Sequence, residues 1–327
     1  MSPAFHGYWR SFARGLESLG HTVEPLVYHG FDSIGARVRN KLVYELPDQL
    51  GLSTGARAFA RHVTRAAVRR LDRSSCDVAL IVKGDVLEDP FWDAMDERRI
   101  RSVLYLYDDL GEMSHDEHTL HRPGHLATFS RRDHATLLAA GYQATYVPAF
   151  FDPDIPYSAV EQDAVVFVGS RYPAREAALP RLHHAGVPVV AYGREWSPRL
   201  RDRLRCWELR RRPLPGRPDV SRGQALGVVS GAAAAVNLHA GRDGFNPRTF
   251  EICGSAGLQV IDRPDVEGLY EPGREILVFG SDDELQALAE RALRDRAWAE
   301  PIRQAARART LAEHTVAHRC QALASLW

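Results

Sequence analysis

Two carboxylates, Asp243 and Glu251, flank the signals of a helix start in the stretch 241–257. Asn246 is a favourable N-cap, because its side chain can accept a hydrogen bond from a free amide of the first turn. Pro247 suits the first helical position, where a missing N–H costs nothing. The free amides and the dipole of such a helix start form an anion site that suits a phosphate. Carboxylates on both sides of a phosphate site suit a ligand with hydroxyls on both sides of a diphosphate, as in a nucleotide sugar.

Each of these acids also has a simpler interpretation. Asp243 could be a solvated acid of the loop, and Glu251 could only stabilise the helix near its N-terminus. His239 stands at the end of an apolar run just before the stretch. It could contact the ligand or a catalytic water, or it could be a histidine of the turn.

The composition is that of a soluble enzyme with more than one domain. The chain has 327 residues, 45% hydrophobic and 26% charged, which is enough for two domains with ample buried core. Its 42 basic residues balance 42 acidic ones, so no overall field draws it to nucleic acid or an anionic membrane. The four cysteines lie far apart without metal-ligand spacing and indicate reduced thiols in a cytoplasmic protein. The sequence shows no signal peptide and no apolar run of membrane-spanning length.

Two continuous apolar runs in the first half, 77–84 and 101–108, indicate parallel strands that are buried on both faces. Open α/β sheets bind ligands outside the carboxyl ends of their strands. The polar residues that follow these runs are therefore candidates for a cleft: Lys83, Asp85, Asp108 and Asp109. The alternative is that Asp85 and Asp109 cap the next helices.

The first helix is expected over 8–19, where apolar residues recur at helical spacing and Gly20 follows as a C-cap. A short strand is expected over 22–28. Leu-Gly-His-Thr-Val, 19–23, resembles the segment that follows the first helix of many GT-B enzymes. In that family a buried strand precedes the helix, and this sequence shows none there. We therefore expect a first sheet whose leading strand is missing or replaced, or a start that is assigned too late.

A histidine-rich segment, 111–125, follows the second apolar run. Its histidines include three at a spacing of three residues, which could suggest a metal site: His115, His118 and His121. Glycine and proline within the segment indicate a loop instead, and no thiol accompanies the histidines. We expect a flexible loop over an acceptor site and no metal centre.

A second α/β domain begins with an apolar strand over 164–169 and a helix that extends to Ala185. Gly169, Arg171 and Arg175 lie in the turn between them. Arginine offers paired donors to phosphate oxygens, so this turn is a candidate for a pyrophosphate clamp. Further strands are expected over 187–192, around Trp207, and over 232–239, 258–262 and 276–279.

The stretch Asp-Gly-Phe-Asn-Pro-Arg-Thr-Phe-Glu, 243–251, resembles the donor motif of retaining GT-B glycosyltransferases, in which two glutamates bracket seven residues. Here Asp243 replaces the first glutamate, and the proline stands one position early. The resemblance implies that the first acid contacts the donor sugar and that Glu251 holds the ribose hydroxyls.

Further motifs, at 82–85, 107–109, 250–257, 271–279 and 313–319, resemble the CgeB-like, spore-maturation group of GT-B glycosyltransferases. This resemblance implies two Rossmann-like domains with parallel sheets that face a central cleft. The expected divisions are an N-terminal acceptor-side domain over 1–151, a nucleotide-sugar domain over 152–311, and a terminal helix over 312–327 that crosses back to the first domain.

The expected function is that of a metal-independent glycosyltransferase that carries a sugar from a nucleoside diphosphate, such as a UDP-sugar, to a small-molecule or glycan acceptor. No bound cofactor is expected, and no Asp-x-Asp metal motif follows a strand, although Asp152 and Asp154 fit that pattern in the linker. The expected catalytic residues are Asp109, His6 and Asp243. The expected donor-binding residues are Gly169, Arg171, Arg175, His239, Gly244, Phe245, Asn246, Arg248 and Glu251.

Three points stay open at this stage. The motif suggests retention of configuration, whereas Asp109 or His6 as a base would permit inversion. The chain could instead be a degenerate GT-B protein that binds a nucleotide sugar or assists an assembly without transferring anything. It could also be a sugar-nucleotide epimerase or hydrolase.

Overall fold

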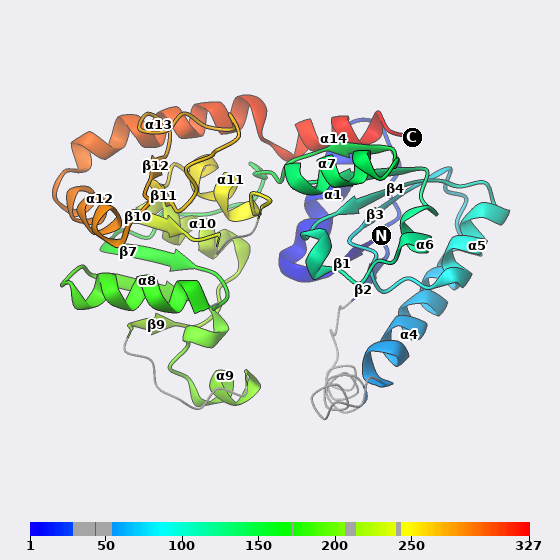
Figure 1. The fold of residues 1–327 in the computed structure, drawn as a ribbon, viewed down its shortest axis with the longest axis horizontal. Coiled ribbons are helices and arrows are strands. Elements are labelled where there is room, and N and C mark those ends of the chain that lie inside the picture. Colours follow the sequence, from blue (N-terminus) through cyan, green and yellow to red (C-terminus); the bar gives the residue numbers. More distant parts are fainter. Residues whose placement is uncertain (29–42, 44–53, 172, 207–213, 240–242) are drawn as a thin grey trace. The chain divides into compact units, whose positions relative to one another are not determined.

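The chain forms two compact α/β units (Figure 1). Unit 1 comprises Met1–Pro148 and Ala317–Trp327, and unit 2 comprises Ala149–Val316. The first division lies three residues before the boundary expected after residue 151, and the return to unit 1 lies five residues after the boundary expected at 311. The computed structural model describes all residues except 29–42, 44–53, 172, 207–213 and 240–242.

Unit 1 is built on a parallel sheet with the strand order β3-β4-β5-β6. The strands are β3 (Val78–Val82), β4 (Arg101–Leu106), β5 (His125–Thr128) and β6 (Ala144–Tyr146). The helices are α1 (Tyr8–Glu17), α4 (Thr54–Leu71), α5 (Asp89–Glu97), α6 (Glu117–Leu120), α7 (Arg131–Ala139) and α14 (Val316–Ala324). In β4 every residue after Arg101 is buried, as expected for a parallel strand covered on both faces. The strands predicted over 77–84 and 101–108 are confirmed.

A two-residue strand, β1 (Ser2–Pro3), precedes α1 and pairs in parallel with β2 (Val27–Tyr28). The N–H of Val82 donates to the carbonyl of Met1 at 2.8 Å, so β1 also lies beside β3. Before α1 the described residues thus contain no full strand, and the two-residue β1, in a two-stranded sheet with β2, stands where the leading strand was expected to be missing or replaced. The strand expected over 22–28 is shorter than predicted, since only its last two residues pair.

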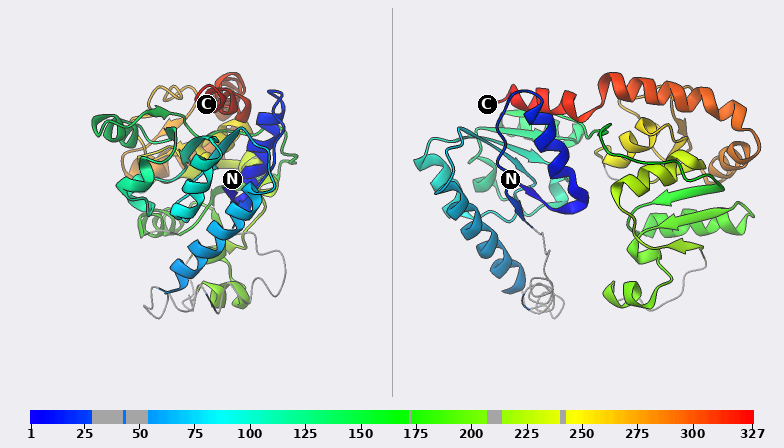
Figure 2. Two further views of the ribbon diagram at one scale, coloured as in Figure 1. Left: turned by 90° about the vertical axis from the view of Figure 1, so that its right-hand side faces the viewer. Right: turned by 180° about the vertical axis from the view of Figure 1, so that it is seen from behind.

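The last helix, α14, belongs to unit 1 (Figure 2). The backbone of Phe151 holds the chain on both sides of the turn before α14, because it donates to His314 and accepts from Val316, each at 2.9 Å. Beyond the turn, the thiol of Cys320 lies 3.7 Å from the carbonyl oxygen of Phe12 in α1. Nε of Arg319 donates to the carbonyl of Pro148 at 2.9 Å.

Unit 2 contains a six-stranded parallel sheet with the order β12-β11-β10-β7-β8-β9. The strands are β7 (Gln162–Val168), β8 (Val189–Tyr192), β9 (Gly216–Arg217), β10 (Ala232–Asn237), β11 (Gln259–Ile261) and β12 (Leu277–Val278). The helices are α8 (Pro173–His184), α9 (Leu200–Arg205), α10 (Arg222–Gly231), α11 (Pro247–Gly254), α12 (Asp282–Arg294) and α13 (Arg296–Glu313). The strand expected around Trp207 falls largely on 207–213, outside the described residues.

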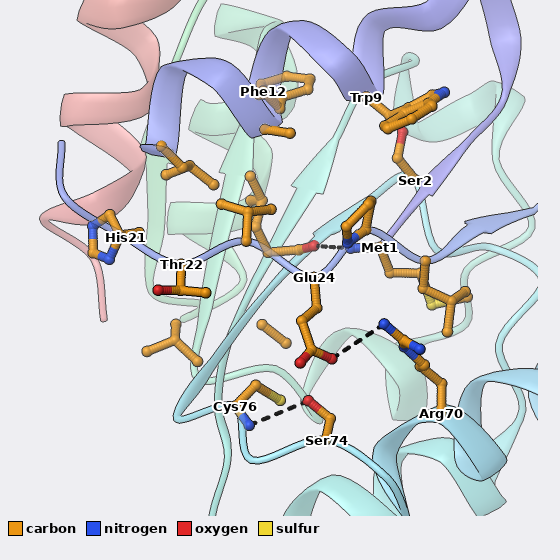
Figure 3. Close-up of a pocket in the computed structure, with 18 of the residues that line it drawn as sticks. Met1, Ser2, Trp9, Phe12, His21, Thr22, Glu24, Arg70, Ser74 and Cys76 are labelled. Atoms are coloured by element: carbon orange, nitrogen blue, oxygen red, sulfur yellow. Dashed lines mark hydrogen bonds and ion pairs between the residues drawn. The ribbon is translucent and has the colours of Figure 1, made fainter. Parts of the chain in front are cut away.

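A cavity of about 600 Å³ lies in unit 1 between α1, the segment 20–27, α4 and the start of β3. Figure 3 shows the amino group of Met1 inside this cavity, where it donates to the carbonyl of Leu80 at 2.5 Å. Burial lowers the pKa of this amino group from 8.0 to about 6, because a buried cation loses its hydration. None of the predicted site residues lines this cavity.

The buried amino group predicts a pH dependence for the chain that begins at Met1. The folded state holds this proton less tightly than the unfolded state, so the free energy of unfolding should rise as pH increases from 6 to 8. A difference of about two pKa units corresponds to about 3 kcal/mol over the whole titration, of which about 2 kcal/mol falls between pH 6 and pH 8. The measurement is urea unfolding at pH 6 and pH 8, with the N-acetylated chain as the control for the histidines. Equal pH dependence in both proteins would contradict the assignment.

Candidate functional site

The sheet of unit 2 has its topological switch point between β7 and β10. From β7 the chain proceeds through β8 and β9 on one side, and then returns to build β10, β11 and β12 on the other. In open α/β sheets, ligands bind outside the carboxyl ends of the strands at such a point. Gly169 follows β7 directly, and His239 stands two residues beyond the end of β10. The sheet therefore brings these two predicted positions to its ligand-binding edge.

Helix α11 begins where the sequence predicts, with Asn246 as N-cap and Pro247 as the first helical residue. Oδ1 of Asn246 accepts from the N–H of Thr249 at 3.2 Å. The buried side chain of Asn237, the last residue of β10, contacts both ends of this cap: its Nδ2 donates to Oγ1 of Thr249 at 2.9 Å, and its Oδ1 accepts from Asn246 at 3.3 Å. The helix start is thus tied to the end of β10. Sequence reasoning missed Asn237, although a polar residue at the end of an alanine-rich strand was a signal.

Glu251 lies one turn into α11, with a side chain that is only 1% exposed. Its Oε1 accepts from Nε of Arg222 at 2.6 Å, and its Oε2 lies 2.8 Å from a terminal nitrogen of Arg248. Arg222 is buried at the start of α10, with its guanidinium 5.7 Å from the centre of the Phe150 ring. The predicted ribose ligand is therefore a buried anion held by two arginines. Arg222 was missed because its partner lies 29 residues away along the chain.

The turn before α11 is anchored by aromatic and basic side chains. Phe245 is 1% exposed, and its ring packs edge to face on His239 with 5.2 Å between centroids. The guanidinium of Arg263 lies 4.5 Å from the centre of the Phe245 ring and donates to the carbonyl of Asp243. Gly244 is buried and Asp243 is half-buried. Asp243 is therefore more accessible than Gly244 and Phe245.

His239 is not an exposed histidine of a turn, since only 1% of it is accessible. The backbone N–H of His239 donates to both carboxylate oxygens of Asp262, at 2.8 and 3.0 Å. The ring Nδ1 of His239 lies 3.4 Å from the same carboxylate. Its Nε2 lies 3.5 Å from Oγ1 of Thr249. His239 thus joins the end of β10 to the first turn of α11.

The two arginines predicted after β7 are only partly described. Arg171 is half-buried in the turn before α8. Arg175 is a residue of α8, but its side chain lies outside the described residues. The pyrophosphate clamp therefore stays a prediction.

In unit 1, the two predicted bases lie in different environments. His6 is exposed and adopts a left-handed conformation with φ +46° just before α1. Asp109 is 8% exposed and precedes the 3-10 helix Leu110–Glu112. It makes no side-chain cap bond to that helix, whose Leu110 N–H donates instead to Asp133 at 2.9 Å. The interpretation of Asp109 as a helix cap is therefore wrong.

A polar cluster occupies the carboxyl ends of β3 and β4. Nζ of Lys83 lies 2.8 Å from Asp108 and 3.7 Å from Asp85. Burial disfavours the charge of Lys83, but the hydrogen bond to Asp108 and the attraction of both acids raise the pKa of its ammonium overall. Asp85 does not cap α5, because the N-cap position of that helix is Glu88.

The histidine-rich segment is only partly a loop, since it contains α6. Nε2 of His115 donates to the carbonyl of Lys83 at 2.8 Å, and burial lowers the pKa of its ring. His118 lies 3.1 Å from Asp89, and His121 lies 4.0 Å from Glu117. No cluster of three or more His, Cys, Asp or Glu side chains suited to a metal ion occurs among the described residues.

The structure also shows the state of the Asp-x-Asp pattern and of the cysteines. In the Asp-x-Asp pattern of the linker, Asp152 is fully buried and accepts from the N–H of Asp154 at 3.0 Å, which is the bonding of a turn. All four cysteines are free thiols. No helix in the described part of the chain is both long and apolar enough to cross a membrane.

Residues 172–325 match the family model described as glycosyl transferase-like. No curated protein matches the chain. Among solved structures, the chain is similar to Anabaena Alr3699/HepE in complex with UDP-glucose, with a TM-score of 0.58 and 16% identity over 80% of this chain and 81% of that one. AviGT4, a glycosyltransferase involved in avilamycin A biosynthesis, gives a TM-score of 0.57 and 15% identity over 96% and 86%. A putative UDP-N-acetylglucosamine 2-epimerase from Listeria monocytogenes gives a TM-score of 0.50 and 9% identity over 82% and 78%. The chain has the GT-B fold.

The buried ion pair predicts a large effect on stability. Glu251→Gln should lower the free energy of unfolding by about 3–5 kcal/mol, because it leaves the charge of Arg222 buried without its counter-ion. Asp163→Asn is the matched control, since Asp163 pairs with Arg296 at 2.7 Å in the same unit but is 89% exposed. The control should lose less than about 1 kcal/mol. Urea unfolding measures both, and equally small losses would show that Glu251 is protonated or solvated.

Proposed function

We propose that this GT-B chain is a glycosyltransferase of the CgeB-like group that acts in the cytoplasm on a nucleoside-diphosphate sugar such as a UDP-sugar. One observation carries the proposal: Glu251 and the start of α11 stand together at the switch point of the unit 2 sheet. The match of residues 172–325 to the glycosyl transferase-like family supports it. So does the UDP-glucose complex of a neighbour that shares the fold.

In this proposal unit 2 binds the donor. The first turn of α11 offers backbone amides and the positive end of the helix dipole to the diphosphate, with Arg171 or Arg175 as further donors. Glu251 accepts from the ribose hydroxyls, and Asp243 contacts the sugar. As the bond between the anomeric carbon and the diphosphate breaks, negative charge grows on the leaving group. The amides and arginines stabilise that charge, so the proposed reaction needs neither a metal ion nor a bound cofactor.

Unit 1 supplies the acceptor side. The hydroxyl of a small-molecule or glycan acceptor forms the new bond to the anomeric carbon, and its proton passes to Asp109 or His6. Asp109 is the stronger candidate, because it stands at the carboxyl end of β4 and its side chain does not cap the following helix. A base in this role gives inversion, whereas the donor motif resembles that of retaining enzymes. The anomeric configuration of the product distinguishes the two.

A second candidate is chemistry on the nucleotide sugar alone, such as epimerisation or hydrolysis. The fold of a putative UDP-N-acetylglucosamine 2-epimerase is similar to that of this chain, so the fold is compatible with that activity. A GT-B protein that binds a nucleotide sugar without turnover is the third. Each gives a different product pattern.

The proposal is tested first by a thermal-shift screen with UDP, GDP, ADP and dTDP. One of these should stabilise the chain, by about 2.7 kcal/mol when present at 100 times its Kd. Sugar nucleotides of that base are then incubated with and without candidate acceptors. Transfer that requires an acceptor supports the proposal. Release of free sugar or epimerisation supports the second candidate, binding without turnover supports the third, and no stabilisation by any diphosphate contradicts all three.

Asp109→Asn should reduce turnover by at least about 100-fold, because general-base catalysis contributes about 10²–10⁴. Donor affinity should be unchanged, since that binding energy comes from unit 2. The melting temperature should also stay within about a degree or two, as no helix cap is lost. Asp133→Asn is the control for a change at the cap itself, since Asp133 accepts from the N–H of Leu110 at the start of the 3-10 helix. Turnover that survives in Asp109→Asn would remove this residue from the chemistry.

A further inference from the structure

The carboxylate of Glu251 is closed off in the structure. Its side chain is 1% exposed, and each of its oxygens contacts one arginine, Arg222 at 2.6 Å and Arg248 at 2.8 Å. A ribose hydroxyl must approach a carboxylate oxygen to about 2.5–3.0 Å to donate a hydrogen bond. With so little of the side chain accessible, that approach requires one of the two arginines to move.

Arg248 is the more accessible of the two arginines. The side chain of Arg222 is 7% exposed and packs on Phe150 at the start of α10. The side chain of Arg248 is 22% exposed and projects from the second residue of α11. If Arg248 leaves, the buried carboxylate keeps Arg222 as its counter-ion, which avoids the large penalty of an unpaired buried charge.

The new partner of Arg248 must be an anion close to the first turn of α11. Under the proposed function, on which this inference rests, the diphosphate of the donor occupies that turn. Arginine binds phosphate oxygens with paired charge-assisted hydrogen bonds. The exchange of a carboxylate for a phosphate therefore offsets the cost of opening the site, but only for a ligand that carries phosphates.

We propose that Arg248 is a gate on the nucleotide site: it covers Glu251 in the empty protein and turns to the diphosphate when a nucleotide binds. A nucleoside without phosphates has to displace Arg248 without offering it a new partner. The gate thus makes binding selective for nucleoside diphosphates over nucleosides. Arg248 acts here as a specificity-determining residue, and Glu251 acts as the ribose ligand that it uncovers.

Arg248→Ala tests the gate, because it should change the affinities for UDP and uridine in opposite directions. Uridine should bind more tightly, by about threefold or more, since no arginine has to be displaced. UDP should bind at least about threefold more weakly, since the loss of a charge-assisted contact with the diphosphate, about tenfold or more, exceeds the roughly threefold gain from not displacing the arginine. Calorimetry gives the UDP affinity, and competition against UDP gives the weaker uridine affinity. If the screen selects another base, its diphosphate and nucleoside replace UDP and uridine.

Arg296→Ala is the matched control, because Arg296 is an arginine of unit 2 in an exposed ion pair. It should leave both affinities unchanged. If Arg248→Ala does not fold, Arg248→Gln keeps the aliphatic part of the side chain without its charge and should show the same opposite changes. Loss of affinity for both ligands, or unchanged UDP affinity, would overturn the gate while leaving the donor site intact. A wild-type chain that binds no nucleoside diphosphate would overturn the proposed function itself.

Discussion

A carboxylate in the interior of a protein must be paired, and Glu251 is the clearest case in this chain. Its side chain is buried in unit 2, where an unpaired charge would cost several kcal/mol. Arg222 from the start of α10 and Arg248 from the start of α11 supply the counter-charges. These contacts tie two helix starts to one carboxylate. The bonds of Asn237 to Asn246 and Thr249 tie the same helix start to the end of β10.

The parallel topology explains why polar residues gather where they do. The interior of each sheet is apolar, so polar side chains that follow the strands meet at one edge. In unit 2 this edge carries His239, which Asp262 and Phe245 hold in place. In unit 1 the corresponding edge carries Lys83 between Asp85 and Asp108, with Asp109 beside them in sequence. Each unit thus presents polar groups at the edge where α/β sheets bind ligands.

The features that sequence predicts well are local ones. The start of α11 follows from Asn246 and Pro247 alone, because a cap is a contact between residues three positions apart. The strands β3 and β4 follow from unbroken apolar runs. The features that escape prediction depend on distant partners. From the sequence alone Arg222 cannot be distinguished from the other arginines, because its role depends on the contact with Glu251. The sequence allows Asp109 to be a cap, whereas in the structure Asp133, 24 residues further along the chain, accepts from the N–H of Leu110. The β1 strand escaped because two residues carry too little pattern for a periodicity to show.

The nucleotide site proposed at the start of α11 and Glu251 can be observed in a crystal structure of the chain with UDP. We expect the diphosphate against the backbone amides of the first turn of α11, and the ribose hydroxyls on the carboxylate of Glu251. A complex in which UDP occupies another part of the chain, such as the cavity around Met1, with Glu251 still covered by both arginines, would contradict it.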